Sequence, residues 1–193
     1  MMHKAIVAIS AMLVAGGTLA VGLRPAKADV QPFDLTFDGA CAGACANGSA
    51  ISQSYGDVAG VVDVQYNKGI NAYTTGAANA AMLFYNTGYR NLTNVAYGTG
   101  AVSEIFLQPL NGRKVVLNSL DLGAWSQPKA GGLTIVDGSN NVLFSTGSIT
   151  IGMGSNHFTF DNISSTTGIG ILGQNPWLVA LAQWVRTSSR PTH

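Results

Sequence analysis

Apolar and polar residues alternate over short stretches through most of the chain after residue 30. Phe33, Leu35 and Phe37 are separated by single polar residues, and Val62 and Val64 are separated in the same way. A period of two places every second side chain on the same face of a β-strand, so these stretches predict half-buried strands. Similar runs occur at residues 105–107, 115–117, 120–122, 133–135 and 158–160.

Two segments between these runs have the composition of hairpin turns. One is Asn111-Gly112, and the other is the Asp-Gly-Ser-Asn sequence of residues 137–140. Asn, Asp and Gly tolerate the positive φ that tight turns require. No segment has a convincing helical period, and residues 76–81 offer one helical turn at most. The pattern predicts an all-β chain that forms an antiparallel β-sandwich of jelly-roll type, with a β-barrel as the alternative.

The N-terminal segment has the pattern of an export signal. His3 and Lys4 precede an uncharged, mostly apolar run over residues 5–23, and Ala-Lys-Ala follows at residues 26–28. Small residues at these positions suit signal peptidase, so we expect cleavage between Ala28 and Asp29. The run is nearly long enough to cross a bilayer, so a retained anchor is the alternative. We therefore expect a signal peptide over residues 1–28, one β-sandwich domain over 29–185, a tail over 186–193 and no membrane span in the mature chain.

Composition excludes several classes of protein. Charged residues make up only 10% of the chain and hydrophobic residues 47%, which is unlike a disordered, charge-extended polymer. Glu104 is the single glutamate, whereas a coiled coil would need many. The formal net charge is +1 and no basic cluster occurs. We therefore expect no nucleic-acid partner.

The two cysteines are separated by three residues, in the sequence Cys41-Ala-Gly-Ala-Cys45. An exported chain meets an oxidising compartment, so we expect a disulfide between them, with Gly43 easing the tight return of the chain. A metal site is a weaker alternative, because only His157 and His193 remain after the leader and zinc takes four ligands. A thioredoxin-like motif would have two intervening residues.

Six segments resemble exported bacterial β-sandwich proteins of the PEP-CTERM (exosortase substrate) kind: residues 41–48 (CAGACANG), 51–57 (ISQSYGD), 62–67 (VDVQYN), 116–125 (VLNSLDLGAW), 133–138 (LTIVDG) and 141–145 (NVLFS). The body of such proteins is similar to galactose-binding-like jelly rolls. The resemblance implies a secreted or envelope-associated protein that contacts the exopolysaccharide matrix. The sorting tail of that group (a Pro-Glu-Pro motif, an apolar span and basic residues) does not occur before the sequence ends at His193.

Residues suited to catalysis are sparse. Ser155, His157 and Asp161 can be drawn as a triad, but residues two and four apart on a strand share a face without converging on one atom. We expect His157 on the surface. Residues 168–173 match G-x-G-x-x-G, yet no helix follows to receive a phosphate, so a strand with glycines explains them. We expect no catalytic residues, with an extracellular glycosidase or polysaccharide lyase as the alternative.

A structural calcium ion is the only cofactor that the sequence suggests. Oxygen ligands are plentiful in β-sandwich loops, and Asp38, after the first predicted strand, is the best single candidate. No complete calcium-loop motif accompanies it. We otherwise expect no cofactor.

Aromatic residues beside amides predict contact with sugars, because a ring covers the C–H face of a sugar while amides bond its hydroxyls. The candidates are Trp125 with Gln127, Tyr89, and Trp177. The alternative is that large aromatic residues fill the core, which we expect for the phenylalanines of the alternating runs. The sequence therefore predicts a secreted, non-catalytic β-sandwich protein, acting as a structural or glycan-interacting component of the bacterial envelope or extracellular matrix.

Overall fold

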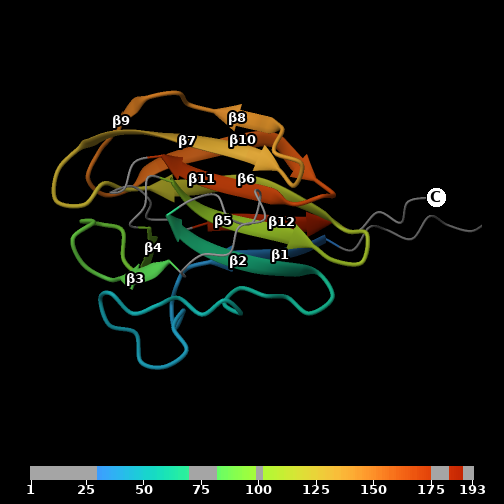
Figure 1. The fold of residues 1–193 in the computed structure, drawn as a ribbon, viewed down its shortest axis with the longest axis horizontal. Helices are drawn as coiled ribbons and strands as arrows, with labels where there is room; N and C mark the ends of the chain where they lie inside the picture. The colour runs from blue at the N-terminus through green and yellow to red at the C-terminus, as the bar shows by residue number, and fades with distance from the viewer. Residues whose placement is uncertain (1–29, 70–81, 99–101, 175–182, 189–193) are drawn as a thin grey trace, which may run out of the picture.

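The computed structural model describes residues 30–69, 82–98, 102–174 and 183–188, and these residues form strands and turns without a helix (Figure 1). The strands are β1 (Val30–Leu35), β2 (Val62–Gly69), β3 (Leu83–Tyr85), β4 (Val95–Tyr97), β5 (Val102–Pro109), β6 (Lys114–Leu122), β7 (Lys129–Asp137), β8 (Val142–Ser145), β9 (Ile149–Ile151), β10 (Asn156–Ser165), β11 (Ile169–Gln174) and β12 (Gln183–Ser188).

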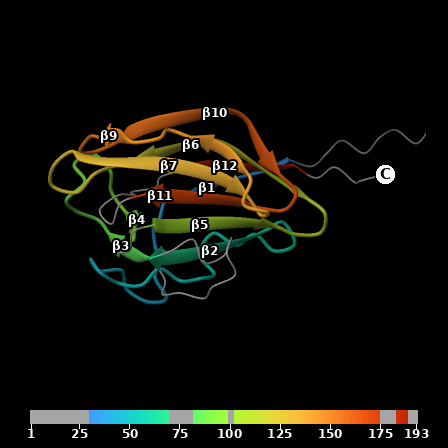
Figure 2. The same ribbon diagram turned by 45° about the horizontal axis from the view of Figure 1, so that its top comes forward.

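The strands form two larger sheets and one small one (Figure 2). The first sheet has the order β1-β12-β6-β10, and the second has the order β2-β5-β11-β7-β8, with β9 also paired to β7. The small sheet consists of β3 and β4. Every strand pair in these sheets is antiparallel. The expectation of an all-β chain with antiparallel sheets is confirmed.

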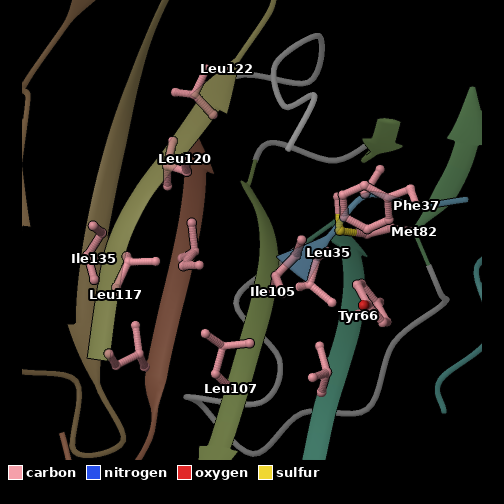
Figure 3. Packing of buried hydrophobic residues seen from close by; sticks show 14 of the residues in the cluster. Leu35, Phe37, Tyr66, Met82, Ile105, Leu107, Leu117, Leu120, Leu122 and Ile135 are labelled. Atoms are coloured by element: carbon pink, nitrogen blue, oxygen red, sulfur yellow. The ribbon is translucent and has the colours of Figure 1, made fainter. Parts of the chain in front are cut away.

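Buried side chains from both larger sheets belong to one hydrophobic cluster. Leu117 and Leu120 come from β6 of the first sheet, and Ile105 and Leu107 come from β5 of the second (Figure 3). Alternation along the strands supplies these side chains, as predicted: in β2, Val62, Val64 and Tyr66 are all fully buried. Burial of this kind is the main favourable contribution to folding.

The alternation in β6 is interrupted by a bulge at Asn118. Leu117 and Leu120 are three residues apart, yet both are fully buried. The pairing of β12 with β6 shifts here by one residue, since Trp184 lies opposite Ser119 and the next residue lies opposite Leu117. A bulge inserts one residue into a strand and resets which residues face the core, so strict alternation alone could not assign this strand.

Strand β5 is buried on both faces, which differs from the half-buried strand that the sequence suggests. Residues 103–107 are all buried, including the single glutamate, Glu104. Glu104 lies opposite Asn67 of β2, which is also fully buried. β5 is an interior strand between β2 and β11. The glycine motif at 168–173 leads into β11, as expected. The ring of Phe106 occupies the space that a Cβ at Gly168 would need.

Both predicted turns are present, but only the one at residues 137–140 closes a hairpin, because β7 pairs with β8 whereas β5 and β6 belong to different sheets. Asn111 and Gly112 have φ values of 53° and 67° and connect β5 to β6. In the turn between β7 and β8, Asp137 Oδ1 accepts hydrogen bonds from the backbone N–H groups of Ser139 (2.8 Å) and Asn141 (2.9 Å), and its Oδ2 accepts one from the Asn141 side chain (2.8 Å). The hydrogen bonds from Asn141 are the largest cause of a lowered Asp137 pKa.

The Asp137→Ala variant should therefore lose stability in a pH-dependent way. A carboxylate whose folded pKa lies below the ordinary 3.8 stabilises the protein above that value, and the contribution is lost as the pH falls through the folded pKa. Urea unfolding should show a higher free energy of unfolding for the wild type than for Asp137→Ala, and this difference should shrink in acid. Asp137→Asn keeps an acceptor oxygen that does not titrate. The difference in free energy of unfolding between Asp137→Asn and Asp137→Ala should therefore not change with pH. A wild-type advantage that persists undiminished in strong acid would contradict this account.

The last strand extends beyond the domain boundary that we expected at residue 185. β12 pairs with β1 as far as Ser188 opposite Val30, so residues 186–188 belong to the sheet rather than to a tail. The expected leader, with its cleavage point between Ala28 and Asp29, lies outside the described residues. Within the parts of the chain that the structure describes, no helix has the length and apolar character needed to cross a membrane.

Candidate functional site

Cys41 and Cys45 form a disulfide, with their Cα atoms 5.4 Å apart. The backbone N–H of Cys41 also donates to Cys45 Sγ at 3.1 Å, and Cys41 forms an isolated β-bridge with Ile51. The disulfide therefore closes a five-residue turn after β1, as predicted. A loop this short removes little entropy from the unfolded chain, so its role is local.

Trp125 is held at the point where the chain leaves β6, with 42% of its surface exposed. The backbone N–H of Ala124 donates to the carbonyl of Gly152 at 3.0 Å, and that of Ser126 donates to the carbonyl of Gly88 at 3.3 Å. The indole ring lies directly over Gly88, and a Cβ at that residue would overlap the ring. These contacts orient the tryptophan while leaving much of it open to solvent.

A polar network lies across β6 and β10. Ser155 Oγ donates to Asp121 Oδ1, and His157 Nδ1 lies 3.0 Å from the same oxygen. His157 is 54% exposed and Asp121 is 21% exposed. Asn91 Oδ1 accepts the backbone N–H of Ser155 at 3.0 Å. The network thus presents hydroxyl, carboxylate, imidazole and amide groups at the surface.

The acid in this network is not the one that the sequence suggested. Asp121, from β6, lies directly opposite His157 in the strand register, whereas Asp161 makes no contact with the histidine that the structure records. Ser155 and His157 both bond one carboxylate oxygen, which differs from the serine–histidine–carboxylate chain of a nucleophilic triad. His157 is a surface residue, as expected.

The loop over residues 86–94, which connects β3 to β4, joins these two features. Gly88 lies beneath Trp125, and Asn91 contacts both Gly154 and Ser155. Trp125 and the polar network therefore flank one loop. We define the candidate surface as Trp125, Gln127, Asn91, Asp121, Ser155 and His157. Gln127 is exposed, and its backbone N–H donates to the backbone carbonyl of Trp125 at 2.8 Å.

Two other candidates stand apart from this surface. Tyr89 is 1% exposed and packs with Leu92, Val95 and Tyr97 in a second small cluster. Burial raises the pKa of its hydroxyl well above the ordinary value. We therefore remove Tyr89 from the glycan-contacting set, because its ring offers no face to a ligand. Trp177 lies outside the described residues.

Asp38, the candidate calcium ligand, is exposed in the turn after β1. Its carboxylate accepts a hydrogen bond from the side chain of Asn94. Among the described residues, no group of three or more His, Cys, Asp or Glu side chains gathers where it could hold a metal ion. Asp38 therefore has a hydrogen-bond partner but no clustered acidic neighbours in this region.

Asp57 and Asp63 are two interacting carboxylates that no sequence pattern singled out. Asp57 Oδ1 accepts the backbone N–H of Val64 at 2.8 Å, and Asp63 Oδ2 accepts the Gln65 side chain at 2.6 Å. Burial raises the pKa of Asp57 most, and the charge of Asp63, within hydrogen-bonding reach, raises it further. The chain folds back at Gly60, which has a φ of 70°, and Val58 forms an isolated β-bridge with Val62.

No protein-family model matches the chain, and no curated protein is significantly similar to it. The geometry of the described residues is therefore the main guide to function. It offers one exposed tryptophan beside a fixed set of hydrogen-bonding groups, and one close pair of carboxylates elsewhere.

Proposed function

We propose that this chain is an exported, non-catalytic β-sandwich protein that acts in the bacterial envelope or extracellular matrix and binds polysaccharide. The observation that carries the proposal is the exposed Trp125, whose ring packs against Gly88 of the loop over residues 86–94, while Asn91 of the same loop bonds the polar network. An indole ring supplies a large apolar face at little entropic cost. The hydroxyl, amide and carboxylate groups around it suit the hydroxyls of a sugar.

The strand order supports a jelly-roll sandwich as the scaffold. In the first sheet the order is β1-β12-β6-β10, and the longer part of the second is β5-β11-β7-β8. The chain passes from one larger sheet to the other between β1 and β2, between β5 and β6, between β6 and β7, between β9 and β10, between β10 and β11, and between β11 and β12. Two interleaved Greek keys in a pair of packed sheets produce this alternation. The shared hydrophobic cluster agrees with sheets packed face to face.

Export is supported by the leader pattern and by the disulfide. Disulfides persist in oxidising compartments and are rare in the cytosol. The Cys41–Cys45 pair is therefore weak evidence for a location outside the cytosol. The resemblance to PEP-CTERM proteins points to the same compartment and to an exopolysaccharide partner.

A glycan array probed with the purified protein tests the binding function. We expect retention on a subset of polysaccharides, and the same spots should remain after calcium is chelated if no ion is needed at the site. Binding that disappears with chelation would instead assign a calcium ion, with Asp38→Asn as the variant to examine. Failure to bind any microbial polysaccharide, by array and by affinity electrophoresis, would contradict the proposal.

An extracellular carbohydrate-active enzyme is the second candidate, and the Asp57–Asp63 pair is the observation in its favour. A raised carboxyl pKa suits a general acid. However, glycosidases place their two carboxyls about 5 to 9.5 Å apart, on either side of the sugar. Asp57 Oδ1 and Asp63 Oδ2 are instead each engaged within the fold, by the backbone N–H of Val64 and by the side chain of Gln65. Release of reducing ends from a bound polysaccharide, abolished by Asp57→Asn, would favour the enzyme.

A further inference from the structure

Two consecutive residues on an edge strand expose apolar side chains to solvent. Val142 is 64% exposed and Leu143 is 38% exposed, and together with Trp125 they are the exposed large hydrophobic residues of the described chain. Both lie on β8, which pairs only with β7 among the strands that the structure describes. Exposed apolar groups gathered on a sheet edge are typical of interaction sites.

A hollow of about 170 Å³ opens beside them, between β8 and β10. Each of these strands ends the order of its own sheet, and Figure 1 shows them close together. The rings of Phe144 and Phe160 meet edge to face with centroids 5.1 Å apart, and Ile163 and Leu143 complete an apolar lining. Thr159 and the exposed Asp161 supply its polar groups. The hollow is therefore suited to one aliphatic side chain.

The pairing of β8 with β7 explains why Leu143 projects. Val142 lies opposite Val136 and Phe144 lies opposite Ile135, so Leu143 is an extra residue in a bulge. A bulge interrupts the ladder of backbone groups that would recruit another strand. This edge consequently offers its side chains, rather than a continuous row of backbone hydrogen bonds, to a partner.

Charge indicates what the partner is. Residues 141–160 contain no Lys, Arg, Asp or Glu, and His157 is their only titratable side chain. Natural sheet edges are commonly protected by charged side chains, which this edge lacks. Two copies of β8 can therefore approach without repulsion along that strand, and Asp161 of β10 is the one charged side chain that lines the hollow. Each copy also carries both parts of the contact, a projecting leucine and an apolar hollow.

We propose that this edge is the interface of a two-fold symmetric homodimer, in which Leu143 of each copy enters the hollow of the other. A two-fold contact uses the same patch twice, so a projection and a hollow side by side on one surface satisfy each other. Because Leu143 lines the hollow itself, the two copies of Leu143 lie close to the symmetry axis. Asp161 stays at the rim, where solvent screens its charge.

Sedimentation analysis of the purified protein from about 1 to 100 µM, the range over which a dimer of modest affinity dissociates, tests the proposal. We expect the wild type to form dimers as concentration rises. Leu143→Asp and Leu143→Lys should each raise the dissociation constant at least about 100-fold, because like charges then meet at the axis. An equimolar mixture of the two variants should restore a dimer, because the charges are then opposite.

Thr93→Lys, which adds a charge at an exposed position in the loop over residues 86–94, is the matched control and should dimerise like the wild type. Unchanged circular dichroism spectra would show that each variant folds. A wild type that stays monomeric over the range, dimers that tolerate both charges, or a mixture that stays monomeric would each overturn the proposal. A monomeric wild type that binds an apolar dye in a Leu143-dependent way would assign the hollow to another occupant.

Discussion

Replacement of Leu117 by alanine should lower the free energy of unfolding by about 3–5 kcal/mol, the range for a buried leucine whose cavity does not collapse. Leu117 is fully buried and comes from β6, whose partners in the cluster include β5 of the other sheet. Domains of this size are stable by only about 5–15 kcal/mol, so the loss is a large fraction of the total. Thermal unfolding followed by circular dichroism should show a melting temperature lower by roughly 10 °C.

Leu110→Ala is the matched control for this change. Leu110 follows β5 and is half-buried, so the same atoms are removed from a site where solvent fills the space. We expect it to cost clearly less than Leu117→Ala. Equal, small effects at both positions would mean that the two larger sheets do not share a tightly packed core, and the proposed sandwich would then be wrong.

Trp125→Ala should weaken polysaccharide binding at least about 30-fold, the effect of removing a binding hot spot. Trp125 is 42% exposed, and the contact of its ring with Gly88 fixes the orientation of the side chain in advance. A prearranged ring loses little entropy on binding. Retention in affinity electrophoresis, compared with that of the wild type, measures the change.

The melting temperature distinguishes a binding role of Trp125 from a role in the hydrophobic core. Because Trp125 is partly exposed, its loss should change the melting temperature by only a few degrees, whereas a core tryptophan would cost about 3–5 kcal/mol. Trp125→Phe should keep part of the binding, since an aromatic face remains. Unaltered retention of Trp125→Ala would remove this residue from the site, and Trp177→Ala would then test the remaining tryptophan of the candidate set.

Local patterns were sufficient to predict the fold class. Alternation identified the buried residues of β2, and the Asn111-Gly112 and 137–140 turns were placed correctly, because both signals depend on neighbours in sequence. The disulfide was predicted for the same reason. The bulge at Asn118 escaped detection because it becomes evident only when β6 is paired with β10 and β12.

The candidate surface depended on contacts that are distant in sequence. Asp121 meets His157 across 36 residues, and Asn91 meets Ser155 across 64. Such pairs follow from strand register, which the composition of each strand does not specify. Tyr89 resembles an exposed ring in sequence, but the loop over residues 86–94 turns it inward against β4. Only the tertiary structure distinguishes it from Trp125.

The position of β12 makes the first sheet one of the last parts of the fold to be completed. The last strand lies between the first strand and β6, so the first sheet is incomplete until residues 183–188 are available. Contacts between the two ends of a chain form slowly, because the entropy of closing a long loop is lost before these contacts stabilise the fold. A polypeptide synthesised from its N-terminus would consequently hold β1 apart from β6, with the first sheet unfinished, until residues 183–188 have been made.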